Sequence, residues 1–118
     1  MLLAGGLVNI PGPATATAEL FNPTTQMFAA AKGNMETPRA FQTATIFGDG
    51  TVLFTGGNDG NSTLATAEVY DPTTGIFSPT GGMLSRRQAH SATPLNDGTV
   101  LVTGGTNGGV LASAELYK

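Results

Sequence analysis

Short apolar runs that end in paired glycines occur at three places along the chain. One of them, Thr51–Thr55, precedes Gly56-Gly57, and its length and β-branched content predict a strand. Glycine can adopt the backbone angles that a chain needs where a strand ends in a tight turn. We therefore expect structural roles for the six glycines of these pairs, which are Gly5, Gly6, Gly56, Gly57, Gly104 and Gly105.

The runs belong to an internal repeat. The segment Met35–Gly57 lies 48 positions before Met83–Gly105 without a gap, and 12 of the 23 aligned pairs are identical. A period near this length is typical of propeller repeats, in which each unit folds as a four-stranded blade.

One full unit predicts four antiparallel strands, named A to D in chain order. The turn Asp49-Gly50 joins A to B, and the turn Asp71–Gly75 joins C to D, because Asp, Pro and Gly favour tight turns. A linker from Pro79 to Arg86 leads to the next strand A. The predicted strands are Ala40–Phe47, Thr51–Thr55, Ala65–Tyr70 and Ile76–Ser78. We expect strands B and C to pair, and no helix over Ala14–Phe21 despite its alanines.

The composition fits an all-β chain and narrows the possible partners. Charged residues are 11%, and the net charge of −3 with a pI near 4.7 argues against nucleic-acid binding. No apolar run approaches the length of a membrane helix. The absence of cysteine excludes disulfides and thiolate metal sites, but it does not fix the compartment.

The N-terminal segment Met1–Val8 has the apolar character of a signal peptide. It carries no basic residue before the apolar run, and it aligns with the later strand-B segments, so we interpret it as a strand.

These residues resemble the kelch-repeat β-propeller family. The closest fit is Ala67–Gly75, which reads Ala-Glu-Val-Tyr-Asp-Pro-Thr-Thr-Gly, together with Phe77 and with the Met-x-x-x-Arg-x-x-His start of Met83–His90. The resemblance extends to bacterial kelch-repeat proteins and, more distantly, to the propeller of galactose oxidase-like enzymes. It implies kelch-type blades over the whole chain, but one fold hosts many functions.

The copper-radical chemistry of galactose oxidase does not transfer to this chain. That chemistry uses two histidines and a tyrosine cross-linked to cysteine, whereas this sequence has one histidine and no cysteine.

The repeat divides residues 1–118 into about two and a half blades. Residues 1–30 supply strands B, C and D, residues 35–80 a full blade, and residues 83–118 strands A, B and C. Closed propellers have four to eight blades. We expect either a piece of a larger propeller, which is the favoured interpretation, or copies that associate through exposed blade faces.

Most charged residues recur with the repeat, which predicts a structural role for them. Each strand C carries a glutamate, and each strand A begins with an arginine, so we expect a buried ion pair that braces each blade. In particular, Arg87 should reach Glu68 or Glu115. The members of this set are Glu19, Glu68, Glu115, Arg39 and Arg87.

Residues outside the pattern are the candidates for binding. Loops between strands B and C differ in length, and the D–A linkers carry the unrepeated charges Lys32, Glu36 and Arg86, whereas the A–B and C–D turns are near copies. Binding residues concentrate on loops of this kind. The candidates are Asn58, Asp59, Asn61, Arg86 and Asn107, with His90 nearby on the inner strand.

His90 is the only histidine, so a metal site that needs three or four ligands lacks partners. It aligns with Gln42, which favours a structural polar role. Asn58–Asn61 has the oxygen-rich character of a calcium loop, but it lacks the downstream acidic ligand. We therefore expect no catalytic residue, cofactor or metal in this chain.

Two functions remain open from the sequence. The favoured one is a non-enzymatic binding or scaffold module that presents loops to a protein or glycan. The alternative is a set of structural blades in a larger secreted galactose oxidase-like or carbohydrate-active enzyme, with catalytic residues outside this chain. Secretion or surface display is slightly favoured.

Overall fold

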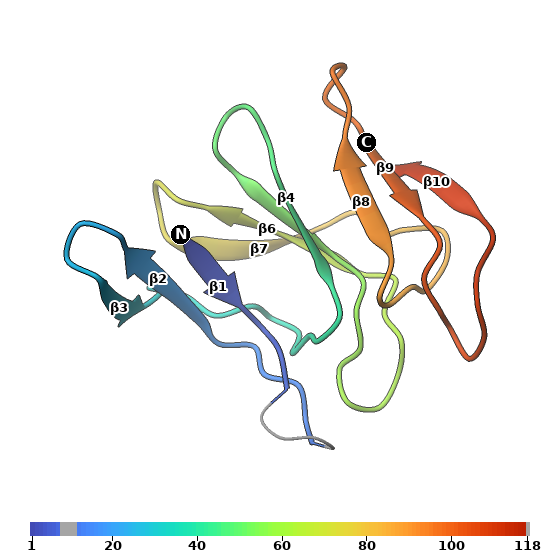
Figure 1. Cartoon of the computed structure of the whole chain (residues 1–118), viewed down its shortest axis with the longest axis horizontal. Coiled ribbons are helices and arrows are strands. Elements are labelled where there is room, and N and C mark those ends of the chain that lie inside the picture. Colours follow the sequence, from blue (N-terminus) through green and yellow to red (C-terminus); the bar gives the residue numbers. More distant parts are fainter. Residues whose placement is uncertain (8–11, 118) are drawn as a thin grey trace.

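The computed structural model describes residues 1–7 and 12–117, and these residues form ten strands and no helix. The strands gather into three antiparallel sheets that lie side by side, as Figure 1 shows. We call them the first, second and third blades. The first blade contains β1 (Leu2–Ala4), β2 (Ala18–Asn22) and β3 (Met27–Ala30). The second contains β4 (Thr43–Ile46), β5 (Val52–Thr55), β6 (Ala67–Asp71) and β7 (Ile76–Thr80). The third contains β8 (Ser91–Pro94), β9 (Val100–Thr103) and β10 (Ala114–Tyr117).

Each blade is a meander in which neighbours in sequence pair in space. The second blade has the order β4-β5-β6-β7, so its strands correspond to A, B, C and D of the repeat. Strand β5 pairs with β6 in a register that sets Val52 opposite Tyr70 and Thr55 opposite Ala67. The expected B–C pairing and the all-β fold are therefore confirmed. Ala14 makes an isolated bridge with Leu7, so the structure also lacks a helix at that point.

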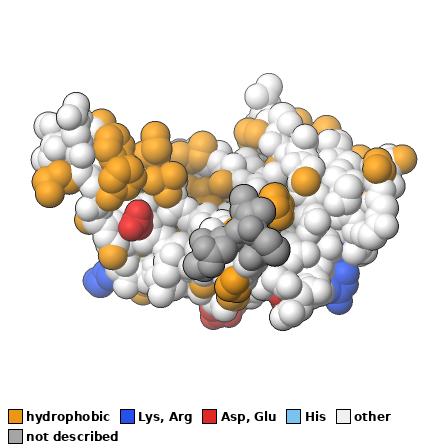
Figure 2. All heavy atoms as spheres, turned by 60° about the horizontal axis from the view of Figure 1, so that its bottom comes forward, with side chains coloured by type: hydrophobic (Ala, Val, Ile, Leu, Met, Phe, Trp, Pro, Cys, Tyr) orange, Lys and Arg blue, Asp and Glu red, His pale blue; other side chains and the backbone are white. Residues whose placement is uncertain are grey.

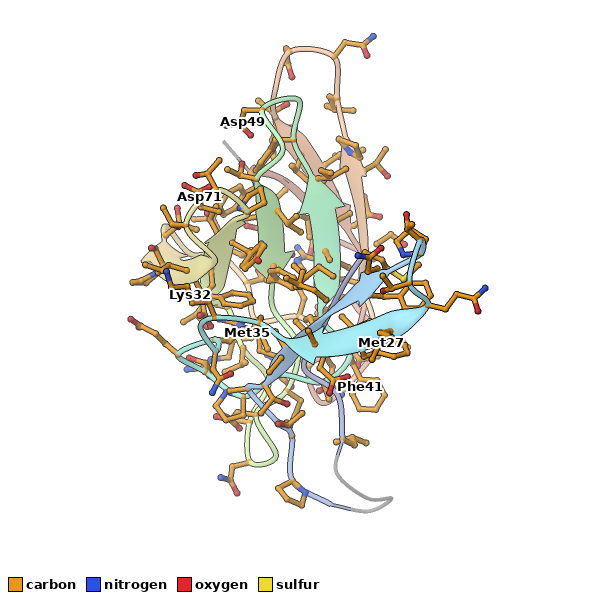
Figure 3. The ribbon with its side chains drawn as sticks, turned by 90° about the vertical axis from the view of Figure 1, so that its left-hand side faces the viewer. Met27, Lys32, Met35, Phe41, Asp49 and Asp71 are labelled. Atoms are coloured by element: carbon orange, nitrogen blue, oxygen red, sulfur yellow. The ribbon has the colours of Figure 1, made fainter. Side chains whose placement is uncertain are left out.

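Aspartate side chains stabilise the hairpin turns on one side of the sheets. The Asp49 carboxylate accepts hydrogen bonds from the backbone N–H and the hydroxyl of Thr51, and Asp71 does the same for Thr73. These bonds lower the pKa of both carboxyls, and the nearby charge of Asp49 slightly opposes this for Asp71. The A–B and C–D turns thus lie together, at the end of the blade opposite Phe41 in Figure 3.

The hydrophobic core consists of two layers between the blades. Successive side chains along each strand of the second blade point to opposite faces of the sheet, so the blade contributes to both layers. Phe54, Tyr70 and Phe77 pack with Ala18 and Met35 against the first blade. Leu53 and Ala67 pack with Met83, Val100 and Val102 against the third blade.

The predicted bounds of all four strands are wrong by one to three residues, and the differences in strands A and D have a structural cause. Strand A was expected from Ala40, but β4 begins at Thr43, because Ala40 pairs with Asn58 and Phe41 has the left-handed φ of 60°. Strand D extends to Thr80, so Pro79 belongs to β7 and not to the linker. Proline is tolerated there because β7 is an edge strand and needs no outer hydrogen bond.

Candidate binding face

The loop between β5 and β6 is built around Asn58 and Asp59. The backbone of Asn58 exchanges hydrogen bonds with that of Ala40, at 2.8 and 2.9 Å, which ties the loop to the start of strand A. The Asn58 side-chain oxygen accepts the N–H of Gly60 at 2.7 Å. The Asp59 carboxylate accepts the N–H groups of Asn61 and Ser62, both at 2.8 Å. The loop therefore holds its own shape, and the Asn61 side chain is exposed.

Arg86 of the following D–A linker joins this loop. Its guanidinium donates to the Thr63 carbonyl at 2.9 Å. The two backbone hydrogen bonds lower the pKa of Asp59, and the positive charge of Arg86 lowers it further. The Arg86 side chain is exposed to solvent, and that of Asp59 is half-buried. The structure thus brings Asp59, Asn61 and Arg86 together on one surface, which we call the rim and which carries a negative and a positive charge.

Two further positions lie elsewhere on the predicted face. Asn107 is exposed on the loop between β9 and β10, where its N–H donates to the Gly109 carbonyl. Among the described residues, no hydrogen bond or ion pair joins it to Asp59 or Arg86. Lys32 was expected to share the face with the other linker charges, but it lies against Gly75 of the C–D turn. The first B–C loop, Leu7–Thr17, includes residues 8–11, which are outside the described residues.

His90 lies inside the molecule and not on the rim. Its Nε2 is 3.0 Å from the Thr43 hydroxyl and 3.1 Å from that of Thr55, so it links the third blade to the second. Its repeat partner Gln42 makes the equivalent link by donating to the Ala4 carbonyl at 2.8 Å. Burial, with a smaller contribution from the charge of Arg87, lowers the pKa of His90. The geometry gives it the same bridging place as Gln42.

One exposed aromatic residue was missed in the analysis of the sequence. Phe41 follows Ala40, which is paired with Asn58, and 55% of its surface is exposed. Its repeat partner is Ala89, which has the same left-handed backbone. The signal was available as a break in the repeat, since a large apolar side chain replaces a small one. Phe41 therefore adds an exposed aromatic side chain directly after the bridge between Ala40 and Asn58.

The recurring charges form the expected ion pairs. Arg39 binds Glu68 at 3.0 Å and Arg87 binds Glu115 at 3.2 Å, each pair within one blade. Each arginine also donates to two backbone carbonyls, which are those of Gly56 and Thr66 for Arg39. The expectation for Arg87 is confirmed with Glu115 as its partner.

The paired glycines make room for neighbouring backbone. A Cβ on Gly56 would overlap the Arg87 carbonyl oxygen, and one on Gly5 would overlap that of Arg39. Glycine is therefore required where strand B meets the next blade.

The described residues contain no group of three or more metal-ligating side chains and enclose no pocket. In the same part of the chain, no helix is long and apolar enough to cross a membrane.

Comparison with known proteins identifies the repeat. Residues 39–84, which include β4–β7, match the family model for the Kelch motif. A search of curated proteins finds no match to the chain. The distant likeness to galactose oxidase-like propellers stays a prediction.

Proposed function

Because this chain is built of kelch repeats, we propose that it is a non-enzymatic binding module whose B–C loops and D–A linkers contact a protein or glycan. The observation that carries the proposal is the rim formed by Asp59, Asn61 and Arg86. These side chains break the repeat, yet ion-paired blades hold the loop and linker that carry them. Function often resides on loops that a rigid scaffold positions.

The chemistry of the rim suits polar recognition. A carboxylate, an amide and a guanidinium can donate hydrogen bonds to, or accept them from, the hydroxyl and amide groups of a ligand. The buried charges cannot take part, because Arg39 and Glu68 satisfy each other. Nothing in this arrangement supplies a nucleophile with an adjacent base, so we assign binding and not catalysis.

The experiment compares two sides of the molecule. A glycan array is probed with the labelled chain, with Asp59→Ala/Arg86→Ala, and with the control Asn96→Ala, which lies in an A–B turn. In parallel, a photo-cross-linker placed at position 61 or at position 96 is used in an extract of the source cells. We expect glycan binding that only the double variant loses, or protein cross-links from position 61 that exceed those from position 96. Equal results for both sides in both arms would overturn the proposal.

We also propose that copies of the chain associate through the outer faces of the first and third blades. The first-blade outer face consists of Met1, Leu3, Phe21 and Phe28, and hydrophobic side chains gather at that end of the molecule in Figure 2. The third-blade outer face consists of Leu101 and Leu116. Exposed contiguous apolar surface of this kind marks an interaction site.

The two outer faces correspond to the two faces of the second blade, which are both buried inside the molecule. Leu3, Phe21 and Phe28 occupy the repeat positions of Phe54, Tyr70 and Phe77, which the second blade buries against the first. Leu101 and Leu116 occupy those of Leu53 and Val69, which pack against the third. Each internal interface joins one face of each type, so the outer faces of two copies can do the same.

A further inference from the structure

One sequence motif in the loop between β5 and β6 has no role in building the blade. Asn61-Ser62-Thr63 has the pattern Asn-x-Thr with a residue other than proline at x, which is the acceptor sequence for N-linked glycans. The chain has one other asparagine with a serine or threonine two positions later, in Asn22-Pro23-Thr24, and its central proline excludes it as an acceptor. The sequence therefore offers a single acceptor asparagine.

The structure presents this motif at the outer end of a short loop. Asn58 and Thr63 form an isolated antiparallel bridge, and the residues between them project from the second blade, as the yellow-green loop at the bottom of Figure 1 shows. Asn61 and Ser62 are exposed, and Thr63 is half-buried. A glycan is bulky and needs such a surface position. The loop lies within the complete four-stranded blade, where both of its flanking strands are paired.

The two side chains that define the acceptor are unengaged. Among the described residues, the Asn61 amide makes no side-chain hydrogen bond, and only the backbone N–H of this residue is held, by the Asp59 carboxylate. The Arg86 guanidinium contacts the Thr63 carbonyl and leaves the Thr63 hydroxyl without a partner in the same part of the chain. A transferase could therefore bind both groups without first breaking a side-chain contact.

The excluded asparagine differs in this respect. The side-chain oxygen of Asn22 accepts the N–H groups of Thr24 and Thr25, at 2.9 and 3.4 Å, so its amide is part of the C–D turn. Sequence and geometry thus select the same asparagine, Asn61.

An acidic residue precedes the acceptor by two positions. Asp59-Gly60-Asn61-Ser62-Thr63 therefore also meets the stricter requirement of some single-subunit oligosaccharyltransferases, which select an acidic side chain at that place. Both hydrogen bonds that the Asp59 carboxylate accepts go to Oδ1. Its Oδ2 can therefore accept a charge-assisted hydrogen bond from a cationic group of the enzyme.

We propose that Asn61 is the acceptor of an N-linked oligosaccharide. Its Nδ2 forms a bond to the anomeric carbon of a lipid-diphosphate-linked sugar donor. The bond from that carbon to the diphosphate oxygen breaks, and the lipid diphosphate leaves with the electron pair. The proton lost from Nδ2 passes to a base of the transferase. This chain is the substrate of the step and supplies no catalytic group.

The modification would also affect the rim. Asn61 lies there with Asp59 and Arg86, so an oligosaccharide on Asn61 would compete with the ligand proposed above. The acceptor itself does not depend on that ligand, because transfer requires the motif and its exposure alone.

The first measurement is made on the native protein purified from its source cells. Trypsin cleaves after Arg39 and Arg86, so Asn61 lies in the peptide of residues 40–86. We expect this peptide to carry the added mass of an oligosaccharide and its fragment ions to place that mass on Asn61. A peptide found only at its unmodified mass would overturn the proposal.

The second measurement asks whether the folded loop is an acceptor. The purified full chain is incubated with a single-subunit oligosaccharyltransferase and its lipid-linked donor, and transfer is followed by intact mass. We expect one oligosaccharide per chain, with Asn22 unmodified. Asn61→Gln should abolish transfer, and so should Thr63→Val, which removes the hydroxyl but keeps the carbonyl that Arg86 contacts. The control Asn107→Gln, at an exposed asparagine outside the motif, should accept as the parent chain does.

A synthetic peptide of residues 56–66 serves as the unfolded reference, and circular dichroism checks that each variant is folded. Transfer to the peptide but not to the folded chain would overturn the proposal, because the fold would then hide the acceptor. Transfer to neither, transfer to another asparagine, or transfer that survives Thr63→Val would also overturn it.

Discussion

The guanidinium of Arg39 lies 3.0 Å from the carboxylate of Glu68, and neither side chain is more than 2% exposed. The pair joins the start of strand A to strand C of the same blade. The Glu68 carboxylate also accepts the N–H groups of Glu36 and Thr37, so it fixes the linker that enters the blade. Replacing one member of this buried pair should destabilise the fold, since the remaining charge would be left without a partner.

Arg39→Met should therefore destabilise the chain by about 3 to 5 kcal/mol, the cost typical of breaking a buried pair. The exposed Arg86→Met serves as the control and should cost about 1 kcal/mol or less, since surface substitutions have small effects. Urea denaturation followed by circular dichroism measures both. If Arg39→Met is too unstable to fold, its spectrum without urea should already be that of an unfolded chain.

The double variant Arg39→Met/Glu68→Leu distinguishes the charge from the packing. It removes both charges, so it should be more stable than Arg39→Met alone, although two side chains have changed. A double variant less stable than either single one would show that the pair matters for its shape and not for its charge balance.

Gly56→Ala and Gly104→Ala form a matched pair that measures contact between blades. Both glycines have left-handed φ angles, of 63° and 67°, so alanine should cost about 1 to 2 kcal/mol at either position. At Gly56 the new Cβ would also overlap the Arg87 carbonyl of the third blade, whereas at Gly104 the nearest atom is 3.7 Å away. We expect Gly56→Ala to cost about 1 to 3 kcal/mol more. Equal losses in thermal unfolding would contradict this packing of the blades.

The blade could be predicted from the sequence because the repeat aligned its turns and its charges. Asp49-Gly50 predicts a hairpin wherever it occurs, and an arginine and a glutamate that recur together predict a bond between them. The start of strand A could not be predicted, since the amino-acid sequence around Phe41 does not indicate a left-handed backbone there. That conformation follows from the tertiary bridge between Ala40 and Asn58.

The candidate site was predictable in part for the same reason. Breaks in the repeat identified Asp59 and Arg86, and the structure places them on one rim. The repeat gave no information about which side chains a linker residue contacts, so the position of Lys32 against Gly75 was unexpected.

His90 should make stability depend on pH in a known direction. Its pKa in the folded chain is lowered from 6.5, mainly by burial and also by Arg87, with Glu115 opposing. The unfolded state then binds more protons as pH falls below 6.5, so this contribution to stability is present above that pH and is lost on acidification until the folded pKa is passed. His90→Gln, which copies Gln42, should remove this dependence. The single histidine resonance gives the folded pKa by NMR, and a midpoint at or above 6.5 would contradict the prediction.

Association through the outer faces should be head to tail, with a first-blade outer face against a third-blade outer face, because the internal interfaces pair one face of each type. Phe28 and Leu116 are 57% and 46% exposed, so Phe28→Asp or Leu116→Asp should leave the fold intact and abolish association in sedimentation velocity runs. Mixing the two variants should restore a dimer, since Phe28→Asp keeps a good third-blade face and Leu116→Asp keeps a good first-blade face. Ile46→Asp, an exposed position on the middle blade, should associate as the parent chain does. A mixture that stays monomeric, or association that survives each single change, would show that the copies do not meet through these faces.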